Sequence, residues 1–170
     1  AAVQALRADE NVELVAMADA FKDRLEKSLN AIKQEFEGEK KIEVKEKNML
    51  VGFNGYKKAI DLADVVILAT PPGFRPLHFK YAIDQDKHVF MEKPVATDAH
   101  GVRQVLETAK VANQKKLNVV VGLQRRYQYS YLNILKQVRR GVIGKITSGQ
   151  VRWNGACLLY TSDAADDGLC

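Results

Sequence analysis

Two short apolar runs in the middle of the chain each end abruptly in polar, proline-rich sequence. Residues 63–72 read Ala-Asp-Val-Val-Ile-Leu-Ala-Thr-Pro-Pro, and residues 87–94 read Lys-His-Val-Phe-Met-Glu-Lys-Pro. Each run predicts a buried strand, with a helix-length segment between the two. In open α/β sheets, ligands bind just outside the carboxyl ends of the strands. We therefore expect these strand ends to share one rim, although two ordinary strands with surface loops are the alternative. The rim residues are Thr70, Pro71, Glu92 and Lys93.

Helical and strand patterns alternate along the rest of the chain. The predicted strands cover residues 12–18, 65–69, 88–91, 118–123 and 143–153. The predicted helices cover residues 22–36, 56–62, 76–84, 97–116 and 131–139, and residues 40–48 are predicted as an edge excursion or a short strand. Strands nearly continuous in Val, Ile, Leu and Ala that alternate with helices indicate an α/β fold with a doubly wound parallel sheet.

Right-handed crossovers place the carboxyl ends of all such strands at one edge of the sheet. Polar residues that directly follow predicted strands should therefore meet there, although they are far apart in sequence. These residues are Asp19, Thr70, Glu92, Lys93, Gln124 and Arg125.

The composition narrows the classes of protein to consider. A chain of 170 residues with 46% hydrophobic and 28% charged residues is long enough for one domain with a core. No apolar run reaches the roughly 20 residues of a membrane helix, so no membrane partner is expected. The net charge of +5 comes from lysines interleaved with acidic residues. Without a concentrated basic face bearing aromatic residues, nucleic acid is not an expected partner.

Both ends of the chain look incomplete. Residues 1–8 resemble the tail of a helix, lack an initial methionine and are not a signal peptide. Residues 157–170 contain both cysteines and no basic residue, and their start resembles a translated transposase adapter from sequencing libraries. We therefore expect a non-native tail, the alternative being a genuine acidic tail with a cysteine pair.

Several of the rim residues have side chains suited to binding a dinucleotide and its substrate. Asp19 is placed to accept hydrogen bonds from adenosine ribose hydroxyls and to repel a 2′-phosphate, which favours NAD over NADP. A helix N-cap is an equally good interpretation of Asp19. The G-x-G-x-x-G loop that cradles the phosphates is absent from the sequence and is expected upstream of residue 1.

Lys93 offers an amine for a substrate oxygen or a proton relay, and Glu92 offers an acceptor for cofactor groups. The alternative for this Glu-Lys pair is a surface salt bridge. Arg125 and Arg126 either bind a polyol or carboxylate or cap the sheet edge. His78 and His100 lie on predicted helices and are interpreted as structural or exposed.

Four segments together are similar to the Gfo/Idh/MocA oxidoreductases, the family of glucose–fructose oxidoreductase and inositol 2-dehydrogenase. They are Ala-Thr-Pro at 69–71, His-Val-Phe-Met-Glu-Lys-Pro-Val-Ala at 88–96, Val-Gly-Leu-Gln-Arg-Arg-Tyr at 121–127 and Gly-Val-Ile-Gly-Lys-Ile at 141–146. The resemblance covers about residues 1–154. It implies a Rossmann domain that binds NAD(P), followed by an α/β domain that closes over the substrate and mediates oligomerisation.

The resemblance also implies roles for individual residues. Lys93 is the catalytic residue beside the nicotinamide and substrate, Arg125 faces the substrate, and the Lys93–Pro94 bond is cis. With Asp19 added from its position at a strand end, the expected cofactor-binding set is Asp19, Ala69, Thr70, Pro71, Glu92, Lys93 and Gln124, and no metal is expected. The chain departs from the family where Pro72 and Arg75 replace an Asn and a His of many members, with His78 three residues later.

The domain and function expectations follow from this resemblance. Residues 1–123 are a truncated Rossmann domain, 124–156 begin the substrate domain, and 157–170 are the non-native tail. The parent protein is expected to oxidise a secondary hydroxyl of a sugar, inositol or related polyol with NAD. The chain as written should be inactive, because the second-domain Asp and His of the family lie beyond Asn154.

Two other functions remain open on the same fold. One is an NAD-dependent glycoside hydrolase, and the other is a non-catalytic nucleotide-binding or regulatory protein. The parent is expected to be a homo-oligomer through its second domain. The cytoplasm is the default compartment, with an export signal upstream of residue 1 as the alternative.

Overall fold

The computed structural model describes residues 1–150 of the chain. Its contacts divide the chain into two compact units, Ala1–Gln124 and Arg125–Cys170. The helices of the first unit are α1 (Ala2–Ala8), α2 (Lys22–Glu35), α3 (Gly55–Asp61), α4 (Arg75–Asp84) and α5 (Ala99–Gln114). Its strands are β1 (Met17–Asp19), β2 (Met49–Val51), β3 (Val65–Leu68), β4 (His88–Met91) and β5 (Val119–Val121). Three 3-10 turns, η1 (Glu46–Asn48), η2 (Pro72–Phe74) and η3 (Gln124–Arg126), and the second-unit helix α6 (Tyr129–Arg139) complete the described elements.

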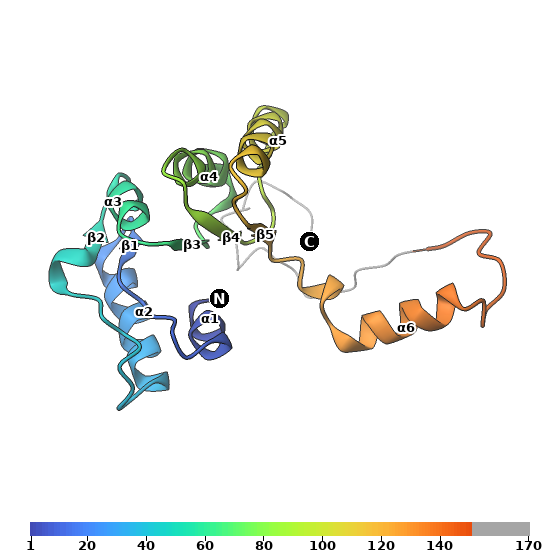
Figure 1. Ribbon diagram of the computed structural model, residues 1–170, viewed down its shortest axis with the longest axis horizontal. Helices are drawn as coiled ribbons and strands as arrows, with labels where there is room; N and C mark the ends of the chain where they lie inside the picture. The colour runs from blue at the N-terminus through green and yellow to red at the C-terminus, as the bar shows by residue number, and fades with distance from the viewer. Residues whose placement is uncertain (151–170) are drawn as a thin grey trace, which may run out of the picture. The chain divides into compact units, whose positions relative to one another are not determined.

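All strand pairs in the described residues are parallel, which confirms the predicted α/β fold. The strands form two groups, β1-β2 and β3-β4-β5. Helices α3, α4 and α5 lie on one side of the strands, whereas α1 and α2 lie on the other (Figure 1). Strand β3 ends at Leu68 opposite Met91 of β4, so the segments that follow both strands leave the sheet at the same edge.

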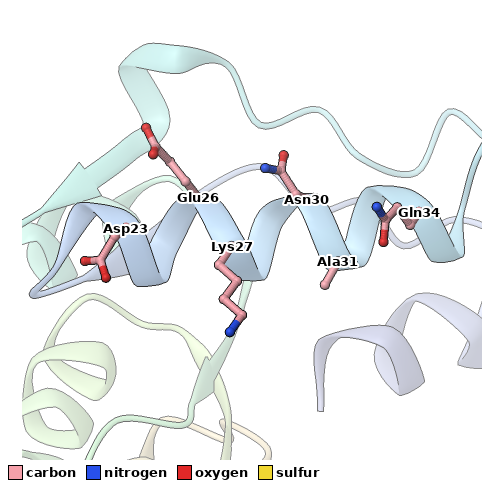
Figure 2. Close-up of a pocket in the computed structure, with 6 residues that line it drawn as sticks. All are labelled: Asp23, Glu26, Lys27, Asn30, Ala31 and Gln34. Carbon is pink, nitrogen blue, oxygen red and sulfur yellow. The ribbon is translucent and has the colours of Figure 1, made fainter.

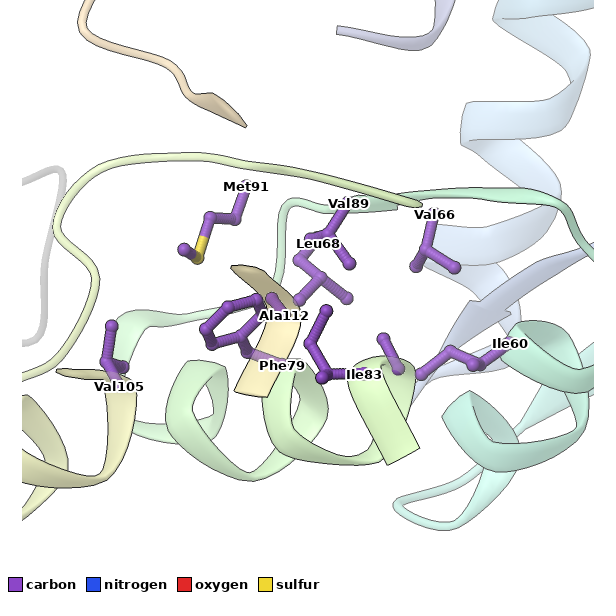
Figure 3. Packing of buried hydrophobic residues seen from close by; sticks show 10 residues of the cluster. Ile60, Val66, Leu68, Phe79, Ile83, Val89, Met91, Val105 and Ala112 are labelled. Atoms are coloured by element: carbon purple, nitrogen blue, oxygen red, sulfur yellow. The ribbon is translucent and has the colours of Figure 1, made fainter. Parts of the chain in front are cut away.

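The main core lies between β3-β4-β5 and the helices α4 and α5 (Figure 3). Alternate strand residues point into it, namely Val66, Leu68, Val89 and Met91. Phe79 of α4 is 0% exposed and packs in the same cluster. Burial of a side chain of that size stabilises the fold by about 1.5–3 kcal/mol. The core therefore fixes α4 against the strands whose ends carry the candidate site.

Helix α2 has the amphipathic pattern that its sequence predicts. Leu25, Leu29 and Ile32 are buried, and Phe36 caps the helix end. Ile32 and Phe36 pack with Leu6 of α1 in a second, smaller cluster. The predicted helix end near Gly38 is confirmed, since α2 stops at Glu35 and Gly38 has a φ of +86°.

Strands β3 and β4 and helices α3, α4 and α5 lie where the sequence predicts them, within a few residues at their ends. Asp98 is the N-cap of α5, and its carboxylate accepts a 2.6 Å hydrogen bond from the Gly101 backbone N–H. Such a cap is worth about 1 kcal/mol.

Two strand predictions were wrong in extent or place. The strand predicted at 12–18 is reduced to β1 and an isolated bridge between Leu14 and Ile42. Residues 40–48, predicted as an edge excursion or a short strand, contain the bridge residue Ile42 and the turn η1, and the strand β2 follows them directly. Residues 143–150 form no strand in the described part, and 151–153 lie outside it, as does the predicted tail. A strand needs a partner, and none pairs with 143–150 among the described residues.

Candidate functional site

A buried arginine joins the ends of β3 and β4. Arg75, the first residue of α4, is 2% exposed. Its Nη1 donates hydrogen bonds to the carbonyl oxygens of Glu92 and, at 2.6 Å, of Pro94. Its Nη2 donates to the carbonyl oxygen of Thr70. The segments after β3 and β4 therefore meet at one rim, as their positions after parallel strands predict.

The position of this arginine is costly unless its hydrogen bonds compensate. A cation at a helix N-terminus opposes the helix dipole. Burial lowers the pKa of Arg75, while the nearby Glu92 carboxylate raises it. Hydrogen bonds from a charged donor contribute about 1.5–3 kcal/mol each. The three carbonyl acceptors thus stabilise a guanidinium whose Nε has no partner within residues 1–150.

Lys93 lies between two carbonyls that the same arginine nitrogen binds. These belong to Glu92 and Pro94, and the Lys93–Pro94 peptide bond is cis. Lys93 itself is exposed. The backbone on both sides of this lysine is therefore tied to α4, whereas its amine is free to reach a ligand at the rim.

The Glu92 side chain rests against the end of β5. A Cβ added at Gly122 would lie 2.8 Å from Glu92 Oε2 and 3.2 Å from its Cδ, so any larger residue would displace the carboxylate from its present position. The Glu92 N–H donates to Leu68 O at 3.0 Å, and the Gly122 N–H donates to Met91 O at 2.8 Å. Glu92 is thus placed where the ends of β3, β4 and β5 come together.

Thr70 is held by a histidine of α4. Its Oγ1 lies 3.2 Å from Nδ1 of His78, within hydrogen-bond distance. His78 is 6% exposed and stacks on Tyr56 at a ring separation of 4.1 Å. Burial, followed by the charge of Arg75, lowers the pKa of His78, so the ring is neutral near pH 7. Both histidines were interpreted from the sequence as structural or exposed; His78 is buried and held within the fold, and His100 is exposed.

Asp19 closes the end of β1 by a local turn. Its Oδ1 accepts a 2.9 Å hydrogen bond from the Phe21 N–H, and its carbonyl accepts one of 2.9 Å from the Gly52 N–H after β2. Gly52 has a φ of +98°, which favours glycine. The N-cap of α2 is Phe21, so the N-cap interpretation of Asp19 was wrong.

The remaining predicted residues are less constrained. Ala69, Pro71 and Gln124 are exposed at the ends of β3 and β5. Arg125 belongs to the second unit, where its Nη1 donates to Gln128 Oε1 at 3.1 Å and its guanidinium lies 5.1 Å from the Tyr131 ring centroid. Its substrate contact therefore stays a prediction, as do the cofactor contacts of the other residues.

Sequence reasoning missed two features of the rim. It treated Arg75 only as a departure from the family sequence. Its place directly before Pro76, at the start of a predicted helix, was the one sequence feature that could have pointed to it. It also missed an exposed aromatic pair, Phe53 after β2 and Phe74 after β3, with ring centroids 6.0 Å apart. Phe74 in turn stacks on His78, so an aromatic column links the two strand ends.

One depression lies away from the rim. An open depression of about 550 Å³ runs along α2 (Figure 2), and all the residues that line it come from that one helix. These are Asp23, Glu26, Lys27, Asn30, Ala31 and Gln34. Residues 1–150 bring no group of three His, Cys, Asp or Glu side chains together as metal ligands. No helix among them is long and apolar enough to cross a membrane.

Comparison with known proteins gives related sequences and structures. Inositol 2-dehydrogenase from Acidothermus cellulolyticus is 30% identical over 109 residues, which cover 62% of this chain and 31% of the relative. An NADP(+)-dependent scyllo-inositol 2-dehydrogenase from Bacillus subtilis is 36% identical over 93 residues, or 54% of this chain and 25% of the relative. The crystal structure of myo-inositol 2-dehydrogenase from Lactobacillus plantarum matches with a TM-score of 0.62 at 30% identity, covering 79% of this chain and 35% of that one.

The chain spans between 25% and 35% of the length of these relatives. A model of the Gfo/Idh/MocA family, described as an oxidoreductase family with an NAD-binding Rossmann fold, matches residues 2–123. These residues hold every described strand and the rim that Arg75 joins. The chain belongs to this family of oxidoreductases.

Proposed function

We propose that the chain is the cofactor-binding part of an NAD-dependent dehydrogenase that oxidises a secondary hydroxyl of a sugar, inositol or related polyol. The observation that carries the proposal is the Arg75 contact, because it brings the Thr70 and Glu92-Lys93-Pro94 segments to one rim of an NAD-binding fold. The substrate class is supported by the inositol dehydrogenases among the relatives.

The residues at the rim fit NAD in part. The Asp19 carboxylate offers an acceptor for ribose hydroxyls, and Glu92 offers a second acceptor at the junction of three strand ends. The phosphate-binding glycine loop is not within these 170 residues. When bound, the nicotinamide supplies the hydride acceptor. We assign Asp19 to the adenosine side and Glu92 to the nicotinamide side.

Lys93 acts on the substrate oxygen in this proposal. Its amine accepts a hydrogen bond from the hydroxyl, takes up the hydroxyl proton as the hydride leaves carbon and the carbonyl forms, and then releases the proton to solvent. Because the backbone on both sides of Lys93 is fixed, the amine is presented at a defined place. Arg125 is assigned to the substrate, and the homo-oligomer is assigned to the substrate domain.

NAD is the preferred cofactor in this proposal, since the negative charge of Asp19 would repel the 2′-phosphate of NADP. NADP(+) is named for a scyllo-inositol 2-dehydrogenase among the relatives, so membership of the family does not fix the cofactor, and the preference for NAD has to be tested. The default cytoplasmic location stays a prediction.

The test uses an intact protein that contains this chain. NADH formation is followed over a panel of inositols, sugars and polyols, for the parent and for Lys93→Ala. We expect turnover with at least one polyol and a loss of about 10²–10⁴-fold in kcat for Lys93→Ala, the usual range for a lost acid–base group. Lys47→Ala, at an exposed lysine of η1, is the matched control.

Each of the other outcomes contradicts a different part of the proposal. Sugar release without net NADH would indicate the glycoside hydrolase. NAD binding with no turnover on any substrate would indicate a non-catalytic protein. Unchanged turnover in Lys93→Ala would remove the role assigned to the lysine.

A further inference from the structure

We propose that Arg75 is a positioning residue, which sets the conformation of the Glu92-Lys93-Pro94 segment and thereby the place of the Lys93 amine. This inference rests on the proposed function for its account of turnover, whereas its structural part does not. Arg75 itself is buried and touches backbone rather than ligand.

The pattern of hydrogen bonds singles out Lys93. One nitrogen, Arg75 Nη1, binds the carbonyls of both neighbours of Lys93 in sequence. The other terminal nitrogen reaches across to Thr70. Rotation of the backbone at Lys93 would break at least one of these bonds, so the direction in which the amine leaves the chain depends on the guanidinium.

The support behind Arg75 is closely packed. Pro76, Phe79 and Ile83 of α4 are buried. A Cβ at Gly101 would lie only 3.0 Å from Pro76 Cγ, so the start of α5 packs closely on the start of α4. Because α4 is held by the core, the guanidinium of Arg75 holds the Glu92-Lys93-Pro94 segment in a defined position relative to the core.

Stability alone does not explain a buried arginine here. A buried salt bridge is weak evidence for stability, because apolar side chains of similar volume often stabilise a fold as well or better, and a buried guanidinium has the same cost of desolvation. The hydrogen bonds of Arg75 go to carbonyl oxygens of two loops rather than to a carboxylate. A planar fork with several fixed donors spans such acceptors, whereas the single ammonium of lysine does not.

The structural arm of the test measures amide hydrogen exchange in the intact protein, comparing the parent with Arg75→Lys and Arg75→Met. We expect exchange of the Glu92 amide, which donates to Leu68 O, and of peptides covering residues 90–96 to accelerate about 10-fold or more. Exchange in the distal part of α4 should stay unchanged. Ile83→Val, at the other end of α4, is the control and should loosen the core without this selective effect.

The kinetic arm is a double-mutant cycle with Lys93→Ala. Arg75→Lys should lower kcat about 10- to 100-fold, because a displacement of about 1 Å can cost 10²-fold in rate. In the Lys93→Ala background, the same change should lower the residual rate less than about 3-fold, since the residue through which it acts is gone. Binding of NAD should change far less than kcat.

The outcomes separate this inference from the proposed function. Additive losses in the cycle, or unchanged exchange at residues 90–96, would overturn the positioning role while NADH formation still supported the dehydrogenase. Selective loosening of residues 90–96 without turnover on any polyol would keep the positioning of the segment and overturn the dehydrogenase.

Discussion

The two ends of the candidate rim are built in different ways. At the β3-β4 end, Arg75 reaches residues 17 and 19 positions away and holds their carbonyls from inside the core. At the β1-β2 end, Asp19 closes a turn with a residue two positions away and accepts one further backbone bond from Gly52. One end is fixed by tertiary packing and the other mainly by local sequence.

This difference matches two tasks in the proposed enzyme. Hydride transfer and proton movement need alignment to a fraction of an ångström, so the segment with Lys93 benefits from a buried anchor. Recognition of the ribose hydroxyls needs one negatively charged hydrogen-bond acceptor, and the Asp19 carboxylate in the turn after β1 provides it. Changes at the β3-β4 end should therefore affect turnover, and changes at the β1-β2 end should affect affinity and cofactor choice.

The largest further effect is expected for Gly122→Ala at the β3-β4-β5 junction. The new Cβ would meet the Glu92 carboxylate at 2.8 Å, and the flexible end of that side chain must move. We expect a loss of about 10-fold in kcat, equivalent to about 1.4 kcal/mol, with little change in thermal stability. Steady-state kinetics and a thermal melt measure the two quantities.

Gly73→Ala is the matched control for Gly122→Ala, because it lies in the segment after β3 and its nearest contact to a new Cβ is an ordinary 3.9 Å. If Glu92 transmits the effect, Gly122→Ala should cost little more once Glu92→Ala is present. Full additivity of the two changes would show that Glu92 is not the group displaced.

A smaller effect, on specificity, is expected for Asp19→Asn at the β1-β2 end. The asparagine oxygen can still accept from the Phe21 N–H, so the turn survives while the negative charge is lost. NAD affinity should fall about 2-fold and the NADP-to-NAD ratio of kcat/KM should rise about 5-fold. Kinetics with both cofactors test this, with Asp23→Asn on α2 as control. An unchanged ratio would mean that Asp19 does not face the ribose.

The smallest effect concerns pH and His78, which links the two ends through the aromatic column. Burial lowers the pKa of His78 from its ordinary value of 6.5. The folded state therefore binds this proton less readily than the unfolded state, and stability falls as the pH drops below about 6.5. The thermal midpoint of His78→Asn should depend less steeply on pH in that range than that of the parent.

The pH prediction has its control in His100→Asn, which alters an exposed histidine and should keep the slope of the parent. Melts between about pH 7.5 and about pH 5.5 cover the window in which a histidine titrates. Equal slopes for His78→Asn and the parent would contradict the assignment of this pH dependence to His78.

Much of the fold followed from local patterns. Strands β3 and β4 are dense apolar runs that end at polar residues, and the α5 cap depends on Asp98 and an N–H three residues away. Strand β2 was missed because Met-Leu-Val after a charged stretch has no pattern of its own. It becomes a strand by pairing with β1, in the register that joins Met17 to Met49.

The sequence by itself determined which polar groups follow the buried strands, because the change from apolar to polar residues can be seen directly in the sequence. The meeting of the Thr70 and Glu92 segments at one edge also follows from it, through the handedness of parallel crossovers. Only the tertiary structure decided that Arg75 is buried beneath both segments, that Gly122 makes room for Glu92, and that His78 holds Thr70. These contacts depend on how α4 packs on the sheet. The spacing of residue types along the sequence does not tell how deeply a given side chain will be buried.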